Sequence, residues 1–138
     1  MMKGQSSIEL LVTFGVVLAF TIPVIFLLFS VSSLGYGDMT KSQADATARV
    51  LADNINIVYG MGNGTKHVLL VNAPASTENI TVSSKEVGVR VKLGDSYYDG
   101  SAPIFAEILK PVVLDSKSSL FSVNITNYNG KVVVDYGK

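Results

Sequence analysis

The first third of the chain carries a long, unbroken run of apolar residues. From Leu10 to Val31 there are 22 residues without a charge. As a helix, this run would span roughly 33 Å, which exceeds the hydrocarbon core of a bilayer, about 30 Å thick. Gly15 and Pro23 lie inside the run, and membrane helices tolerate both because neighbouring helices satisfy the freed backbone groups. The pattern predicts a membrane-spanning helix with a bend rather than a break.

The next part of the chain has the apolar period of an amphipathic helix. Between residues 40 and 59 apolar residues recur at spacings of four, three, four and three, namely Ala44, Ala48, Leu51, Ile55 and Val58. Charged residues lie on the opposite side of this helix, at Lys41, Asp45, Arg49 and Asp53. Because Gly35 and Gly37 weaken the helix between the two patterns, we expect one long helix over residues 6–59 with a bend or looser turn near 35–37.

From Lys66 onward the pattern has a period of two, which is typical of strands. The stretch VGVRVKL (87–93) places its valines on one face and Arg90 and Lys92 on the other. Further runs read as strands: HVLLV (67–71), NITVS (79–83), PIFAEIL (103–109), LFSVNIT (120–126) and KVVVDY (131–136). Residues 94–101, GDSYYDGS, read as an exposed turn. About six strands after one long helix predict an α+β protein with a small antiparallel, sandwich-like head domain over residues 60–138.

The charges are unevenly distributed along the chain. There are 11 basic and 11 acidic residues, yet only Lys3 and Glu9 precede Asp38. The head is therefore ordinary in charge and has no basic patch of the kind that binds nucleic acid. Cysteine is absent, which excludes disulfides and thiolate metal sites. The positive flank formed by Lys3 and the α-amine predicts that the N-terminus stays in the cytoplasm and the head lies outside.

Candidate catalytic chemistry is sparse. His67 is the only histidine, at the expected start of a strand, and the acidic residues of the head are scattered singly. They build no Ser-His-Asp set, metal cluster or carboxylate pair. The glycine-rich stretch GMGNGTK (60–66) does not match the phosphate-loop pattern, and it follows a helix rather than preceding one. We therefore expect a protein that is not an enzyme and that uses neither a cofactor nor a metal.

One carboxylate, Glu9, stands at the edge of the apolar run, directly after MMKGQSSI. By position alone it can lie in the headgroup layer, where a carboxylate costs little. The stretch MMKGQSSIEL also resembles the class III signal peptide of archaeal type IV pilins and archaellins. The resemblance is close over residues 3 to about 31 and looser over the β-rich remainder.

This resemblance implies a processing site. In that family a prepilin peptidase cuts on the cytoplasmic side, after the glycine, and leaves the apolar helix on the mature protein. Here residues 1–4 would form the leader, with Lys3 and Gly4 before the cut and Gln5 as the first mature residue of a helix over 5–59. Gln5 favours the adhesion-type pilins over archaellins, whose first mature residue is usually small.

The resemblance also implies a role for Glu9 in assembly. Glu9 becomes the fifth mature residue and matches the family's glutamate, which is proposed to meet the N-terminal amine of a neighbouring subunit. Cleavage creates an α-ammonium that a filament core would bury, and an unpaired buried charge is strongly destabilising. Besides Glu9, we expect assembly to involve the apolar residues Leu10, Phe14, Leu18 and Ile22. The implied product is a helical homopolymer on the cell surface, serving in adhesion, whose subunits are held in the cytoplasmic membrane before assembly.

Three other interpretations of the N-terminus stay open. A secretory signal peptide has an apolar region of only about 7 to 15 residues, and no A-x-A-like cleavage site follows this longer run. A monomeric, single-span surface protein with a binding head would keep its N-terminus uncut. An archaellin would share the processing but would serve in motility.

N-x-[ST] sequons begin at Asn63, Asn79 and Asn124. All three lie beyond the apolar run, on the side expected to be outside. In the last two the middle residue is an inward-facing isoleucine, so strand alternation turns the asparagine toward solvent. We expect Asn79 and Asn124 to be glycosylated in a host with the machinery, and Asn63 to be similarly accessible in a loop. The alternative is that they are polar surface asparagines without sugar.

Overall fold

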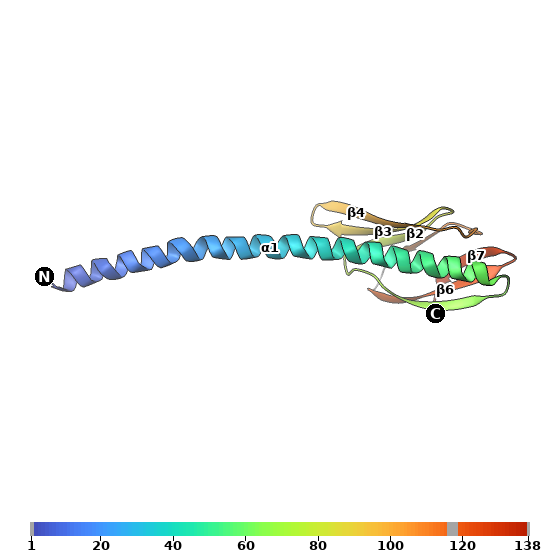
Figure 1. Ribbon diagram of the computed structural model, residues 1–138, viewed down its shortest axis with the longest axis horizontal. Coiled ribbons are helices and arrows are strands. Elements are labelled where there is room, and N and C mark those ends of the chain that lie inside the picture. Colours follow the sequence, from blue (N-terminus) through green and yellow to red (C-terminus); the bar gives the residue numbers. More distant parts are fainter. Residues whose placement is uncertain (1, 116–118, 138) are drawn as a thin grey trace. The chain divides into compact units, whose positions relative to one another are not determined.

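The computed structural model of the chain describes residues 2–115 and 119–137 (Figure 1). It consists of a helix, α1 (Met2–Met61), followed by strands that form two antiparallel sheets, so the predicted α+β class is confirmed. The chain divides after Gly37 into two compact units. Met1, the first residue of the expected leader, lies outside the described residues.

Helix α1 is longer than the sequence predicts. It begins at Met2, contains Pro23 and ends at Met61, where Gly62 adopts a φ of +95°. Residues 35–37 are helical, so the looser turn expected there is absent from the secondary structure. Glycine lowers helix propensity by only about 1 kcal/mol relative to alanine, a loss that is small enough for a long helix to continue through two glycines.

The seven strands in the described part of the chain are divided between two separate sheets, and neighbours within a sheet are not always consecutive in the chain. The smaller sheet has the order β1-β6-β7, and the larger has the order β4-β3-β2-β5. The smaller sheet consists of β1 (Lys66–Asn72), β6 (Leu120–Tyr128) and β7 (Lys131–Tyr136). The larger sheet consists of β2 (Thr77–Val82), β3 (Glu86–Leu93), β4 (Ser96–Pro103) and β5 (Val112–Asp115). An Asn129–Gly130 turn, with both residues at positive φ, joins β6 to β7, as is usual for a two-residue hairpin loop.

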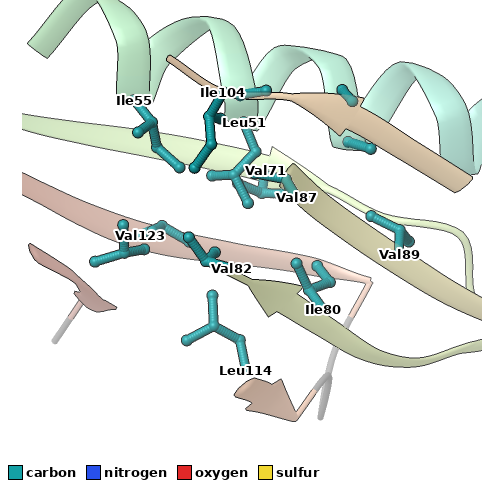
Figure 2. Close-up of a cluster of buried hydrophobic side chains, with 14 of the residues drawn as sticks. Leu51, Ile55, Val71, Ile80, Val82, Val87, Val89, Ile104, Leu114 and Val123 are labelled. Atoms are coloured by element: carbon teal, nitrogen blue, oxygen red, sulfur yellow. The ribbon is translucent and has the colours of Figure 1, made fainter. Parts of the chain in front are cut away.

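The core of the head lies between residues 38–61 of α1 and the inner faces of the two sheets. In Figure 1 this part of the helix runs with β4, β3 and β2 on one side and β6 on the other. Each of the five residues of the predicted apolar stripe is at most 1% exposed, which confirms that interpretation. Figure 2 shows Leu51 and Ile55 pointing from the helix into a cluster that contains Val82, Val87 and Val123.

Helix and sheet approach most closely at Gly100 on β4. A Cβ added at Gly100 would lie 2.8 Å from Asp45 Oδ1 and 3.0 Å from the carbonyl carbon of Ala44. On the same strand the Tyr98 hydroxyl donates to the Asp45 carboxylate, at 2.8 and 3.0 Å from its two oxygens. The helix therefore packs directly against the backbone of β4 at Gly100, and the hydrogen bonds between Tyr98 and Asp45 hold the two elements together beside it.

A buried asparagine connects the end of α1 to the smaller sheet. Asn127 on β6 is 1% exposed, and its amide nitrogen donates to the carbonyls of Val58 (3.3 Å) and Tyr59 (3.2 Å). Its side-chain oxygen accepts from the Gly130 N–H at 3.1 Å. The last turn of a helix has carbonyls without intrahelical partners, and Asn127 satisfies two carbonyls there.

Two assignments made from the sequence, one of a turn and one of a strand, differ from the structure. Within the turn expected over residues 94–101, only Gly94 and Asp95 form a turn, because β4 begins at Ser96 and pairs with β3 along its whole length. The strand expected over residues 103–109 does not form: Pro103 ends β4, and Asn56 Oδ1 accepts the N–H groups of Phe105 (2.8 Å) and Ala106 (3.2 Å). Beyond them, Ile108 makes only an isolated bridge to Val132. A polar side chain from the helix has replaced the sheet as the partner of this backbone.

Candidate functional site

The first candidate site is the apolar part of α1, residues 2–37. Here none of the side chains is buried, and the large apolar residues between Ile8 and Leu34 are 46–73% exposed. By length and composition this helix is able to cross a membrane. Apolar side chains surround the helix on all sides instead of forming a stripe, which is typical of a helix covered all round by lipid or by other helices.

The residues expected to act in assembly share one face of this helix. Leu10, Phe14, Leu18 and Ile22 follow one another at intervals of four and are 67, 65, 47 and 49% exposed. Their neighbours on the other faces are exposed to the same degree, so the geometry of one chain does not single these four out. Glu9 directly precedes Leu10, the first residue of this row, and is exposed.

The three hydroxyl groups within the apolar run from Leu10 to Val31 are satisfied by the helix itself. Thr13 Oγ1 donates to the Glu9 carbonyl (2.8 Å), Thr21 Oγ1 to the Val17 carbonyl (2.7 Å) and Ser30 Oγ to the Phe26 carbonyl (3.0 Å). An unsatisfied hydroxyl would cost several kcal/mol in hydrocarbon. These bonds let the segment enter an apolar environment without a polar partner from elsewhere. In the sequence, the signal for such bonds is a serine or threonine inside an apolar helical run, whose hydroxyl reaches the carbonyl four residues back.

The expected processing site lies in the first turn of α1. Lys3, Gly4 and Gln5 are helical and exposed. Cleavage between Gly4 and Gln5 therefore requires the first turn of the helix to open. Terminal turns fray, and a glycine lowers helix propensity by about 1 kcal/mol, so Gly4 makes this opening easier.

The three sequons occupy different environments on the head. Asn63 is exposed in the turn after α1, where its side-chain oxygen accepts the Asn129 N–H at 2.8 Å. Asn79 on β2 and Asn124 on β6 are half-buried, at positions that alternate with the buried Ile80 and Ile125. All three asparagines reach the surface, and Asn63 is the most exposed of them.

The electrostatics of the head surface centre on one ion pair. Among the described residues, Arg90 on β3 and Asp99 on β4 form the sole ion pair, with Nε–Oδ1 and Nη2–Oδ2 distances of 2.7 and 3.1 Å. The hydrogen bond from Arg90 lowers the pKa of Asp99, and the same bond raises the pKa of Arg90. The hydrogen bond to Asp45 raises the pKa of Tyr98. In residues 2–115 and 119–137 no three His, Cys, Asp or Glu side chains are grouped to hold a metal ion.

Comparison with protein-family models, with curated proteins and with solved structures found no match.

Proposed function

We propose that this chain is a structural subunit, a pilin, of an extracellular type IV pilus-like filament that serves in adhesion. The observation that carries the proposal is the helix over residues 2–37, which is apolar on every side, buried nowhere and bears one carboxylate at Glu9. Such a helix needs an apolar cover, and copies of itself provide one as well as lipid does. The function proposed is structural, without catalysis or a cofactor.

The proposed pathway begins in the membrane. The apolar helix holds the subunit there with the head outside, and a prepilin peptidase cuts after Gly4. Helices then leave the lipid and pack against one another in the filament core. Exchange of lipid for other apolar helices keeps the same surface out of water, and the self-satisfied hydroxyls of Thr13, Thr21 and Ser30 travel with it. The heads form the outer layer and carry glycans at Asn63, Asn79 and Asn124.

Glu9 has a specific task in this proposal. After the cut, the new α-ammonium of Gln5 lies at the tip of an apolar helix, and the core of a filament buries it. A carboxylate from the next subunit neutralises that charge at the one axial offset where the two groups meet. The pair therefore sets the register between subunits more than it adds stability.

The first experiment is mass spectrometry of the N-terminal peptide from material sheared off the cell surface. The expected peptide begins at Gln5, as such or cyclised to pyroglutamate. If the protein instead stays with the membranes and begins at Met1 or Met2, the filament proposal is wrong. The chain would then be a single-span surface protein with a binding head.

A second experiment separates assembly from processing. Glu9→Gln keeps the size of the side chain and removes its charge, so the subunit should be cut and held in the membrane but should fail to appear in sheared filaments. Glu107→Gln, at an exposed position on the head, is the matched control and should assemble normally. Normal filaments from Glu9→Gln would contradict the role given to this residue. Loss of swimming on deletion of the gene would identify the filament as an archaellum instead.

A further inference from the structure

The outer face of the larger sheet is hollowed at its centre. The hollow has a volume of about 390 Å³, within the range of roughly 300–1,000 Å³ that is usual for small-molecule sites. It exists because Gly88 on β3 has no side chain and a Cβ placed there would meet nothing within 4 Å. Thr81 on β2 and Ser101 on β4 are the cross-strand neighbours of Gly88 and form the sides of the hollow.

The two ends of the hollow are polar. The Arg90–Asp99 ion pair closes one end, two residues along β3 and β4 from Gly88 and Ser101. Glu86 lies at the opposite end on the same strand as Gly88. The lining therefore presents hydroxyl groups, which both donate and accept, together with carboxylate acceptors, the remaining N–H donors of a guanidinium and one apolar side chain, Val113 on β5.

This lining selects against most classes of ligand. Two carboxylates and one guanidinium leave an excess of negative charge, and the guanidinium is already held by Asp99, so an anion is disfavoured. A metal ion is disfavoured because the Asp99 carboxylate is engaged in the same pair. An apolar ligand would leave the hydroxyls of Thr81 and Ser101 without partners.

We infer that this hollow, the Gly88 trough, binds a neutral saccharide. Each hydroxyl of a sugar ring donates and accepts at once, which matches the mixed lining of hydroxyls, carboxylates and guanidinium. Tyr97, which precedes Asp99 by two residues on the same face of β4, is 54% exposed and offers an aromatic surface beside the trough. The inference concerns the head of a single chain and does not depend on cleavage or filament assembly.

The sugar can have two sources. Asn79 also lines the trough, opposite Arg90, and begins a sequon, so a glycan attached there would start at the trough. Alternatively the trough takes a sugar presented by another molecule. Both sources supply the same hydroxyl chemistry, and the experiment below distinguishes them.

The test uses the full chain, made in a host without N-glycosylation and kept in a detergent that contains no sugar. Saturation-transfer NMR is recorded with the methyl glycosides of glucose, mannose and galactose and with N-acetylglucosamine. A monosaccharide of about a dozen non-hydrogen atoms should bind with a Kd on the order of 1 mM. Transfer to at least one of these sugars supports the site, and absence of transfer to all four at about 10 mM overturns it.

Two variants locate the binding. Gly88→Val places a branched apolar side chain in the trough, starting from a Cβ that meets nothing within 4 Å, and should weaken binding by about tenfold or more. Thr81→Val keeps the shape but removes one hydroxyl, and should weaken binding by about two- to tenfold. Thermal unfolding checks that both variants fold. Unchanged binding by a folded Gly88→Val variant would overturn the assignment.

A final comparison identifies whether the bound sugar comes from the Asn79 glycan or from another molecule. Wild type is produced in a glycosylating host and in a host without N-glycosylation, and both forms are titrated with the sugar that binds best. Mass spectrometry checks that the first form carries a glycan at Asn79. If the Asn79 glycan occupies the trough, the glycosylated form binds the free sugar more weakly than the unglycosylated form. If the two forms bind equally, the trough serves a sugar from another molecule.

Discussion

In residues 2–37 of α1 no side chain is buried, whereas in residues 38–61 eight side chains are. The two halves have the same secondary structure, and both are rich in apolar residues. They differ in where those residues lie, because the first half is apolar on every side and the second half concentrates them in a stripe. A stripe can be covered by one small head of the same chain, whereas a helix that is apolar all round needs a surrounding of lipid or of other helices.

The largest effect should come from a charge placed in the first half. Leu18→Arg is expected to cost about 3–4 kcal/mol on insertion into the membrane and to remove the protein from the membrane fraction. Val50→Arg is the matched control in the second half, because Leu18 and Val50 are 47 and 48% exposed within the chain. Val50→Arg should change the free energy of unfolding of the head by less than about 0.5 kcal/mol. Carbonate extraction followed by immunoblotting measures how much of each variant stays in the membrane fraction. Equal retention of Leu18→Arg and Val50→Arg would contradict the difference between the two halves of the helix.

The next effect should come from a cavity in the second half. Leu51 is fully buried and projects into the core shown in Figure 2, so Leu51→Ala should lower the free energy of unfolding of the head by roughly 3 kcal/mol. Leu18→Ala makes the same chemical change in the first half and should leave unfolding of the head unchanged. Urea unfolding followed by circular dichroism is the measurement. A similar loss in both variants would mean that the first half contributes to the stability of the head.

Two glycines on neighbouring strands sharpen the comparison further. At Gly100 a methyl group would push against the backbone of the helix at Ala44, so Gly100→Ala should destabilise the head by about 1–3 kcal/mol. At Gly88 the added methyl group meets nothing, and Gly88→Ala should be neutral or slightly stabilising in a strand. The midpoint of urea unfolding distinguishes them. Equal midpoints would place the helix farther from β4 than the geometry indicates.

The smallest effect should come from the surface ion pair. Arg90 holds the pKa of Asp99 below its ordinary value of 3.8. The stabilisation it supplies is therefore present above that value and is lost as the pH falls through the lowered pKa. Both side chains are about half exposed, so solvent screening keeps this contribution small. The Tm difference between wild type and Asp99→Asn should be small and constant above about pH 5 and should vanish toward pH 2. A difference that grows in acid would contradict this account.

Local patterns in the sequence were sufficient for several features of the fold. The spacing of Ala44, Ala48, Leu51, Ile55 and Val58 predicted the buried face of the helix, and all five are buried. Alternation in VGVRVKL predicted the inward valines of β3 correctly. These predictions succeeded because helix and strand periods act over a few residues and need no knowledge of distant partners.

Features that depend on distant partners were missed. Residues 94–101 carry polar and glycine residues typical of a turn, yet from Ser96 onward they belong to β4, because β3 and the helix provide its partners. Asn56 and Asn127 look like ordinary polar residues, yet they bind backbone groups 49 and 69 residues away. A single sequence does not reveal which backbone groups would otherwise lack a partner.

The sequence by itself determined that this protein has an apolar helix bearing one carboxylate, an amphipathic continuation and a β-rich head. Each of these is encoded in spacing and composition along the chain. Only the tertiary structure decided that Gly100 meets the helix while Gly88 opens a trough on the outer face, and that Thr81, Ser101 and the Arg90–Asp99 pair surround that trough. The physical reason is that strand pairing brings together residues far apart in the chain, and the register of that pairing is set by the whole core.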